Sequence, residues 1–81
     1  MTREEITAAF LDALAGVAPE IDLGDLDPAQ DLRDAFDLDS MDILNMTITL
    51  HETLGTEIPE EDAHKVTTVS GAVDYLESLL G

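Results

Sequence analysis

Residues 39–55, DSMDILNMTITLHETLG, decide how this chain folds. Apolar residues recur in this stretch at intervals of three and four positions, which is the spacing of an α-helix. The stretch follows a long acidic segment and stops at Gly55, a residue type that commonly comes directly after a helix end. We therefore predict a helix over about residues 40–54.

The predicted helix carries two apolar stripes on nearly opposite faces. At about 100° per residue, Met41, Leu44 and Ile48 form one stripe, and the other contains Ile43, Met46, Leu50 and Leu54. One stripe must face a core, and the other faces either more core or solvent. A methionine-containing apolar strip bordered by polar residues suits adaptable partner binding, so the Met41 stripe is a candidate docking surface.

Ser40 stands at the start of this helix. A serine there is ordinarily a cap, because its hydroxyl binds a free backbone amide. Asp39 is at least as good a cap, and Asp39 with Asp42 has the spacing of a capping box. Ser40 would then be the first helical residue, and a phosphodiester on it would lie near the positive helix end, although the aspartates oppose it. A capping role and a role in attachment both stay open at this point.

Further helices are predicted on both sides of this stretch. Thr2 and Glu5 have capping-box spacing ahead of an apolar helical pattern. Pro59 suits a first helical position, and Thr67 or Thr68 suits the cap of a last helix. These helices cover about residues 2–17, 59–64 and 69–80. The buried side of the last one is expected to contain Val69, Ala72, Val73, Leu76, Leu79 and Leu80.

The connection over residues 18–39 contains Gly24, Pro28 and a single cation, Arg33, among many acids. We predict a long loop, with at most one short helical turn, and loops of such length are uncommon unless they are functional. Its apolar residues would pin it to the core: Ile21, Leu23, Leu26, Leu32, Phe36 and Leu38. The fold class is therefore all-α: a small four-helix bundle in one domain, residues 1–81, with a long loop after the first helix and a short third helix.

Charge and composition restrict the function. The chain has 81 residues, and its 19 acids against Arg3, Arg33 and Lys65 give a net charge of −16. This charge repels nucleic acid and anionic membranes and favours basic protein partners. Cysteine is absent, which excludes disulfides and a thiol nucleophile. The polar N-terminus and the lack of a long apolar run lead us to expect a cytoplasmic protein without a membrane span. We also expect the protein to be a monomer and, because of its charge, not to contact membranes.

Other kinds of site have weak support in the sequence. His51 and His64 are too few and too far apart for a metal site. The acidic stretch from Asp25 lacks the glycine and the glutamate of a calcium loop. Ser40 is not set in a Gly-x-Ser-x-Gly nucleophile motif. We expect no metal ligands and no catalytic residue, and we expect Tyr75 at the edge of the core with its hydroxyl bonded to a partner.

The order of these elements and two motifs resemble the acyl carrier proteins. Residues 37–42, DLDSMD, contain the family's Asp-Ser-Leu/Met-Asp motif at Asp39 to Asp42. Residues 54–76, LGTEIPEEDAHKVTTVSGAVDYL, closely resemble the family over their whole length. The strongest matches in this second motif are Ile58, Pro59, Thr67, Thr68, Val69, Asp74 and Tyr75. The resemblance covers nearly the whole chain.

The resemblance implies a carrier protein and not an enzyme. Ser40 would hold 4′-phosphopantetheine, transferred from coenzyme A by a phosphopantetheinyl transferase, and its thiol would hold acyl or related groups as thioesters. The helix over residues 40–54 would be recognised by acyl- or aminoacyl-loading and acyl-processing enzymes with basic docking surfaces. The partner-binding residues implied are Asp39, Met41, Asp42, Leu44, Asn45, Ile48 and Glu52.

Two departures from the family pattern matter. The family often has glycine two residues before the Asp-Ser pair, so here the loop either avoids a positive φ or Asp37 adopts it. The helix over residues 40–54 is also less acidic than in carriers of primary fatty acid synthesis. A fatty acyl, polyketide, aminoacyl or other dedicated cargo therefore stays open. So does a different class, an acidic helical interaction module without a prosthetic group.

Overall fold

The structure is a computed structural model that describes residues 2–20, 22 and 26–80. Its ordered elements are all helical, which confirms the predicted all-α class. In chain order they are α1 (Arg3–Val17), α2 (Leu32–Phe36), α3 (Ser40–Leu54), the 3₁₀ helix η2 (Glu60–Val66) and α4 (Val69–Leu80). In the part of the chain that is described, no helix is both long enough and apolar enough to cross a membrane.

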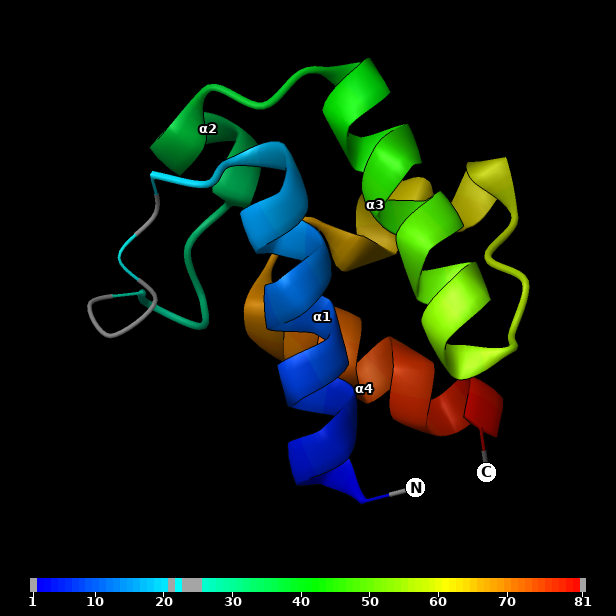
Figure 1. Cartoon of the computed structure of the whole chain (residues 1–81). Coiled ribbons are helices and arrows are strands. Elements are labelled where there is room, and N and C mark those ends of the chain that lie inside the picture. Colours follow the sequence, from blue (N-terminus) through cyan, green and yellow to red (C-terminus); the bar gives the residue numbers. More distant parts are fainter. Residues whose placement is uncertain (1, 21, 23–25, 81) are drawn as a thin grey trace.

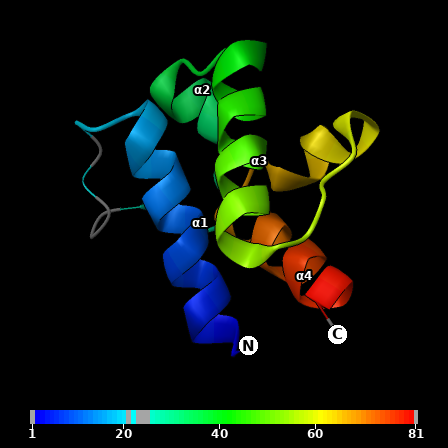
Figure 2. The same ribbon diagram turned by 45° about the vertical axis from the view of Figure 1, so that its right-hand side comes forward.

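The long helices α1 and α3 lie side by side and run in opposite directions (Figures 1 and 2). α1 also packs against α4, and η2 packs against both α4 and α3. The short α2 lies near the end of the molecule where α3 begins. One side of α3 therefore faces the bundle, while part of the rest borders η2.

The core is formed by apolar side chains from every helix. Full burial of one large aliphatic or aromatic side chain stabilises a fold by about 1.5–3 kcal/mol. Eight large side chains are almost completely buried: Ile6, Phe10, Leu14, Leu32, Met46, Leu50, Val66 and Leu76. The apolar spacing of the sequence predicted these positions except Val66. The predicted burial of Leu79 is wrong, since this side chain is 41% exposed on the outer side of the last turn of α4, and Leu80 is only half-buried.

Capping side chains fix the beginnings of several helices, among them α1 and α4. At α1, the Glu5 amide donates to Thr2 Oγ1 at 3.2 Å, and the Thr2 amide donates to Glu5 Oε1 at 2.9 Å, so the predicted capping box is confirmed. At α4, the Gly71 amide donates to Thr68 Oγ1 at 3.0 Å. Of the two threonines considered for this cap, Thr68 is therefore the one used.

The connection between α1 and α3 is held against the core by its apolar residues. Leu32 and Leu38 are buried, and Leu26 and Phe36 are half-buried against the same cluster. The predicted anchors Ile21 and Leu23 lie outside the described residues.

Backbone hydrogen bonds secure this connection as well. The Leu32 amide donates to the Thr67 carbonyl at 2.8 Å, and the Ser70 amide donates to the Pro28 carbonyl at 2.9 Å. Both bonds join the connection to the junction of η2 and α4. The expected short helical turn is α2, and these contacts hold it in place.

The third predicted helix differs in detail from the one observed. Pro59 has ψ near 144° and precedes the helix instead of starting it, so η2 begins at Glu60. The helix is of the tighter 3₁₀ type and continues to Val66, two residues beyond the predicted end. Val66 is completely buried, so packing against the core accounts for the longer helix.

Candidate attachment and docking site

Ser40 is the first residue of α3 and does not cap it. The Asp42 amide donates to Asp39 Oδ1 at 2.9 Å, and the Asp39 amide donates to Asp42 Oδ2 at 3.2 Å. This reciprocal pair is the predicted capping box. Ser40 is exposed, and among the described residues its hydroxyl has no hydrogen-bond partner. The hydroxyl is thus free for attachment.

Asp37 produces the turn that leads from α2 into α3. Its φ of 56° and ψ of 40° lie in the left-handed region, so of the two possibilities left open by the sequence, Asp37 adopts the positive φ. Aspartate tolerates this region better than most residues, because its short side chain bonds locally. The Leu38 amide donates to the Arg33 carbonyl at 3.2 Å across the turn.

The two stripes of α3 have opposite environments. Met46 and Leu50 are completely buried, and Ile43 is 6% exposed. Met41 and Ile48, in contrast, are exposed by 60% and 48%, and Leu44 by 42%. The outer stripe (Met41, Leu44 and Ile48) therefore faces solvent, which is the second of the two possibilities that the sequence allowed.

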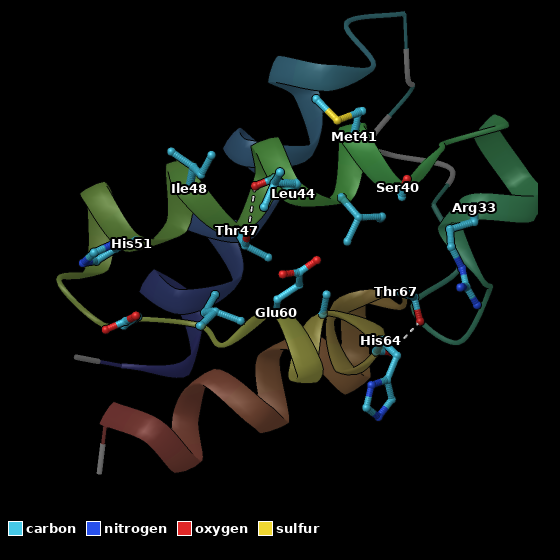
Figure 3. Close-up of a pocket in the computed structure, with 14 residues that line it drawn as sticks. Arg33, Ser40, Met41, Leu44, Thr47, Ile48, His51, Glu60, His64 and Thr67 are labelled. Carbon is cyan, nitrogen blue, oxygen red and sulfur yellow. Dashed lines mark hydrogen bonds between the residues drawn. The ribbon is translucent and has the colours of Figure 1, made fainter.

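An open groove of about 620 Å³ runs between the outer stripe and η2. Figure 3 shows Ser40 and Arg33 toward one end of this groove and His51 at the other, with Glu60 between α3 and η2. Its apolar lining consists of Met41, Ile43, Leu44, Ile48, Ile58 and Ala63. Ser40 thus lies at one end of a partly apolar groove.

The predicted partner-binding residues lie on the accessible side of α3. Asp39, Asn45 and Glu52 are exposed, and Asp42 is half-buried. The two capping carboxylates each use one oxygen on a backbone amide. Their negative charge, together with the outer stripe, gives a surface on which apolar residues are flanked by carboxylates.

Arg33, Glu60 and Ala63 line the groove but were not predicted as site residues. Arg33 Nη2 lies 3.0 Å from Asp31 Oδ2, and this hydrogen-bonded contact raises the pKa of Arg33 and lowers that of Asp31. A signal for Arg33 was present in the sequence, because it is the single cation of the acidic connection. Glu60 and Ala63 carry no such signal, because they line the groove only through the packing of η2 beside α3.

Two threonine hydroxyls are buried at the groove. Thr47 Oγ1 donates to the Leu44 carbonyl at 2.7 Å, and Thr67 Oγ1 donates to the His64 carbonyl at 2.9 Å. These bonds satisfy hydroxyls that would be costly to bury alone. For Thr47, which is 7% exposed, the bond within its own helix explains how a polar side chain can be buried there.

Tyr75 joins α4 to η2. Its hydroxyl donates to Asp62 Oδ2 at 2.7 Å, and Lys65 Nζ lies 3.4 Å from Asp62 Oδ1. Lys65 also lies 5.2 Å from the centre of the Tyr75 ring. Burial and the neighbouring Asp62 raise the pKa of Tyr75 to about 12. The expected hydroxyl partner of Tyr75 is therefore Asp62. This bond ties η2, whose residues Glu60, Ala63 and His64 line the groove, to α4.

Within the described residues, no group of three or more histidine and acidic side chains is arranged to hold a metal ion. His51 and His64 both line the groove, although they belong to different helices. The calcium-loop candidate begins at Asp25, which lies outside the described residues. The chemical features of the site are therefore the Ser40 hydroxyl, the groove and the surrounding charges.

Comparison with known proteins defines the class of this site. A family model described as a phosphopantetheine attachment site matches residues 8–76. An acyl carrier protein of Rubrobacter xylanophilus is 37% identical over 76 residues, covering 94% of this chain and 93% of the relative. An acyl carrier protein of Lactobacillus johnsonii is 35% identical over 78 residues, covering 96% of each chain. No solved structure matches this chain significantly.

The matched domain is the attachment site for phosphopantetheine in carrier proteins. The chain belongs to the acyl carrier protein family. It is accordingly a carrier protein and not an enzyme, and it acts together with partner enzymes. Its cofactor is phosphopantetheine.

Proposed function

We propose that Ser40 carries the 4′-phosphopantetheine group through a phosphodiester on its hydroxyl. The observation that carries this proposal is the capping box of Asp39 and Asp42, which leaves the Ser40 hydroxyl exposed and without a structural task. The groove gives the attached arm a channel that starts at Ser40. When bound, the group supplies a terminal thiol, which holds acyl groups as thioesters.

We propose further that partner enzymes dock on α3 beside Ser40. The outer stripe would supply the apolar contact, and Asp39, Asp42 and Glu52 would meet basic residues of the partner, with Asn45 between them. These side chains are accessible, and exposed charges mainly steer association and set its specificity. A phosphopantetheinyl transferase would be one partner, and enzymes that load or process the cargo would be the others. Affinity is therefore expected to be modest and to fall with salt.

The cargo that the groove supports best is an acyl chain of fatty acid, polyketide or another dedicated lipid-related synthesis. Leu44 and Ile48 form one wall and Ile58 and Ala63 contribute to the other, so an apolar chain finds contacts on both sides. An aminoacyl cargo is the second candidate. The observation that favours it is the pair of carboxylates on the groove, Glu57 and Glu60, which would attract an amine.

The attachment is tested by the intact mass of the folded protein. The chain is incubated with coenzyme A, magnesium and a broad-specificity phosphopantetheinyl transferase. The wild-type protein should gain the mass of one phosphopantetheine, and Ser40→Ala should gain none. Ser78→Ala, which changes an exposed serine on α4, is the matched control and should gain mass like the wild type. A folded wild-type chain of unchanged mass would favour an interaction module without a prosthetic group.

A further inference from the structure

Arg33 is a permanently charged side chain in the lining of the groove that contains Ser40. The chain has three lysine and arginine residues, Arg3, Arg33 and Lys65, and all of them lie in described parts of the structure. Arg3 pairs with carboxylates of α4, and Lys65 pairs with a carboxylate of η2. Of the three, only Arg33 lines the groove that contains Ser40.

The fold brings Arg33 and Ser40 to the same end of this groove, although α2 and α3 are separate helices (Figure 3). Leu32, the neighbour of Arg33, is completely buried and bonded through its amide to the Thr67 carbonyl. The left-handed turn at Asp37 then leads the chain into α3. The backbone of Arg33 is thus fixed, while its side chain is half exposed.

Because of the negative charges around Ser40, a cation there would stabilise a phosphodiester attached to its hydroxyl. Asp37, Asp39 and Asp42 are close to Ser40 in sequence and would repel a phosphodiester on its hydroxyl. Arginine is well suited to bind phosphate, because its planar fork donates two parallel hydrogen bonds. A single cation at this end of the groove offsets part of the repulsion.

The present partner of the Arg33 side chain is replaceable. Arg33 Nε and Nη2 lie 3.3 and 3.0 Å from the two carboxylate oxygens of Asp31. This pair is on the surface, where solvent weakens ion pairs. Asp31 also caps α2 by accepting the Arg33 amide at 2.9 Å, so its carboxylate keeps a hydrogen bond when the guanidinium leaves.

We propose that Arg33 binds the phosphodiester of the arm on Ser40, exchanging the Asp31 carboxylate for phosphate oxygens. This inference rests on the proposed attachment at Ser40. The contact holds the first part of the arm at the Ser40 end of the groove and directs the remainder along the outer stripe of α3. Arg33 is therefore a positioning residue for the prosthetic group.

Nitrogen-15 NMR of the arginine side chains tests this contact directly in the full-length chain. The two arginines give two Nε–H signals, which are recorded before and after loading, with the loading established by intact mass. The Arg33 signal should shift on loading. The signal of Arg3, which lies on α1 and pairs with carboxylates of α4, should stay in place. The phosphorus-31 signal of the loaded protein should differ between wild type and Arg33→Gln, whereas Arg3→Gln should leave it unchanged.

The outcomes separate the two proposals. A wild-type chain that gains no mass overturns the attachment and this inference with it. A chain that gains mass on Ser40 while the Arg33 signal stays in place, and while Arg33→Gln has the wild-type phosphorus signal, overturns the role of Arg33 alone. Because the wild-type comparison needs no substitution, a poorly folded variant does not prevent the decision.

Discussion

The inner face of α3 buries Met46 and Leu50 completely, whereas the outer stripe leaves Met41, Leu44 and Ile48 between 42% and 60% exposed. Both faces consist of residues of the same kind on the same helix. Burial of the inner face stabilises the bundle. The outer stripe adds little to folding in this state, although it borders the groove and begins beside Ser40. Apolar surface that folding does not use is available for binding.

Leu50→Ala against Leu44→Ala is the substitution pair that separates the faces most strongly. Removal of a completely buried leucine side chain is expected to lower the free energy of unfolding by about 2–5 kcal/mol. The same change at the exposed Leu44 should alter it by no more than about 0.5 kcal/mol. Denaturant unfolding measures both. Equal losses would show that the outer stripe also belongs to the core.

The start of α3 offers a second comparison, between Asp39 and Ser40. Asp39→Ala removes a cap and should lower the free energy of unfolding by about 0.5–2 kcal/mol, whereas Asp39→Asn keeps an equally good cap. Ser40→Ala should be nearly neutral, because the Ser40 hydroxyl makes no bond to the described residues. Thermal or denaturant unfolding of the three variants decides this. If Ser40→Ala cost as much as Asp39→Ala, the serine would be the cap.

The hydrogen bond that joins α4 to η2 is tested through the single tyrosine, Tyr75. The phenol absorbance of Tyr75 should titrate near pH 12 in the folded protein, because burial and Asp62 disfavour the phenolate. Its pKa is raised by folding, so this contribution to stability is complete below about pH 10 and is lost as the pH rises toward 12. Asp62→Asn should lower the Tyr75 pKa. A wild-type value near 10 would mean that the bond from Tyr75 to Asp62 is not maintained in solution.

The contribution of Asp62 to stability is lost at low pH, whereas that of Tyr75 is lost at high pH. The Tyr75 hydroxyl and Lys65 lower its pKa, so its contribution to stability is present above the ordinary aspartate value and is lost as the pH falls through the lowered one. Tyr75→Phe should therefore be less stable than wild type at neutral pH. This difference should shrink below about pH 4. A difference that stays constant across acid pH would argue against the hydrogen bond to Asp62.

Added salt should have the smallest effect, and it should separate folding from docking. A net charge of −16 in so small a fold destabilises it by self-repulsion, so salt or millimolar magnesium should raise the melting temperature by a few degrees. The same salt should slow association with a basic partner enzyme, because it screens the charges beside the outer stripe. A melting temperature that does not change with salt would show that the acids are better compensated than their number suggests.

Short-range sequence patterns predicted the helix α3, its two apolar stripes and its capping box, because each depends only on neighbouring residues. The helical spacing located α3 and its two stripes, and the spacing of Asp39 and Asp42 located the capping box. Neither pattern could determine whether the Met41 stripe is buried, because that depends on where η2 packs. The structure shows that η2 lies beside the stripe and leaves the groove open.

Features that depend on distant parts of the chain were beyond such patterns. Arg33 reaches the Ser40 end of the groove only because the bond from Leu32 to Thr67 and the turn at Asp37 hold α2 in place. Asp62 becomes the partner of Tyr75 for a similar reason, since η2 must first pack on α4. The sequence offered the residue types, and tertiary packing decides which of them meet.

The most direct test of this account is to locate the attached group by fragment mass spectrometry of the loaded, folded protein. The chain has three serines, Ser40, Ser70 and Ser78, of which Ser40 alone opens onto the groove. All of the added mass should lie on fragments that contain Ser40. Fragments that lose the phosphopantetheine during the measurement should also be ones that contain Ser40. Added mass on Ser70 or Ser78, or none on a folded chain, would contradict the account.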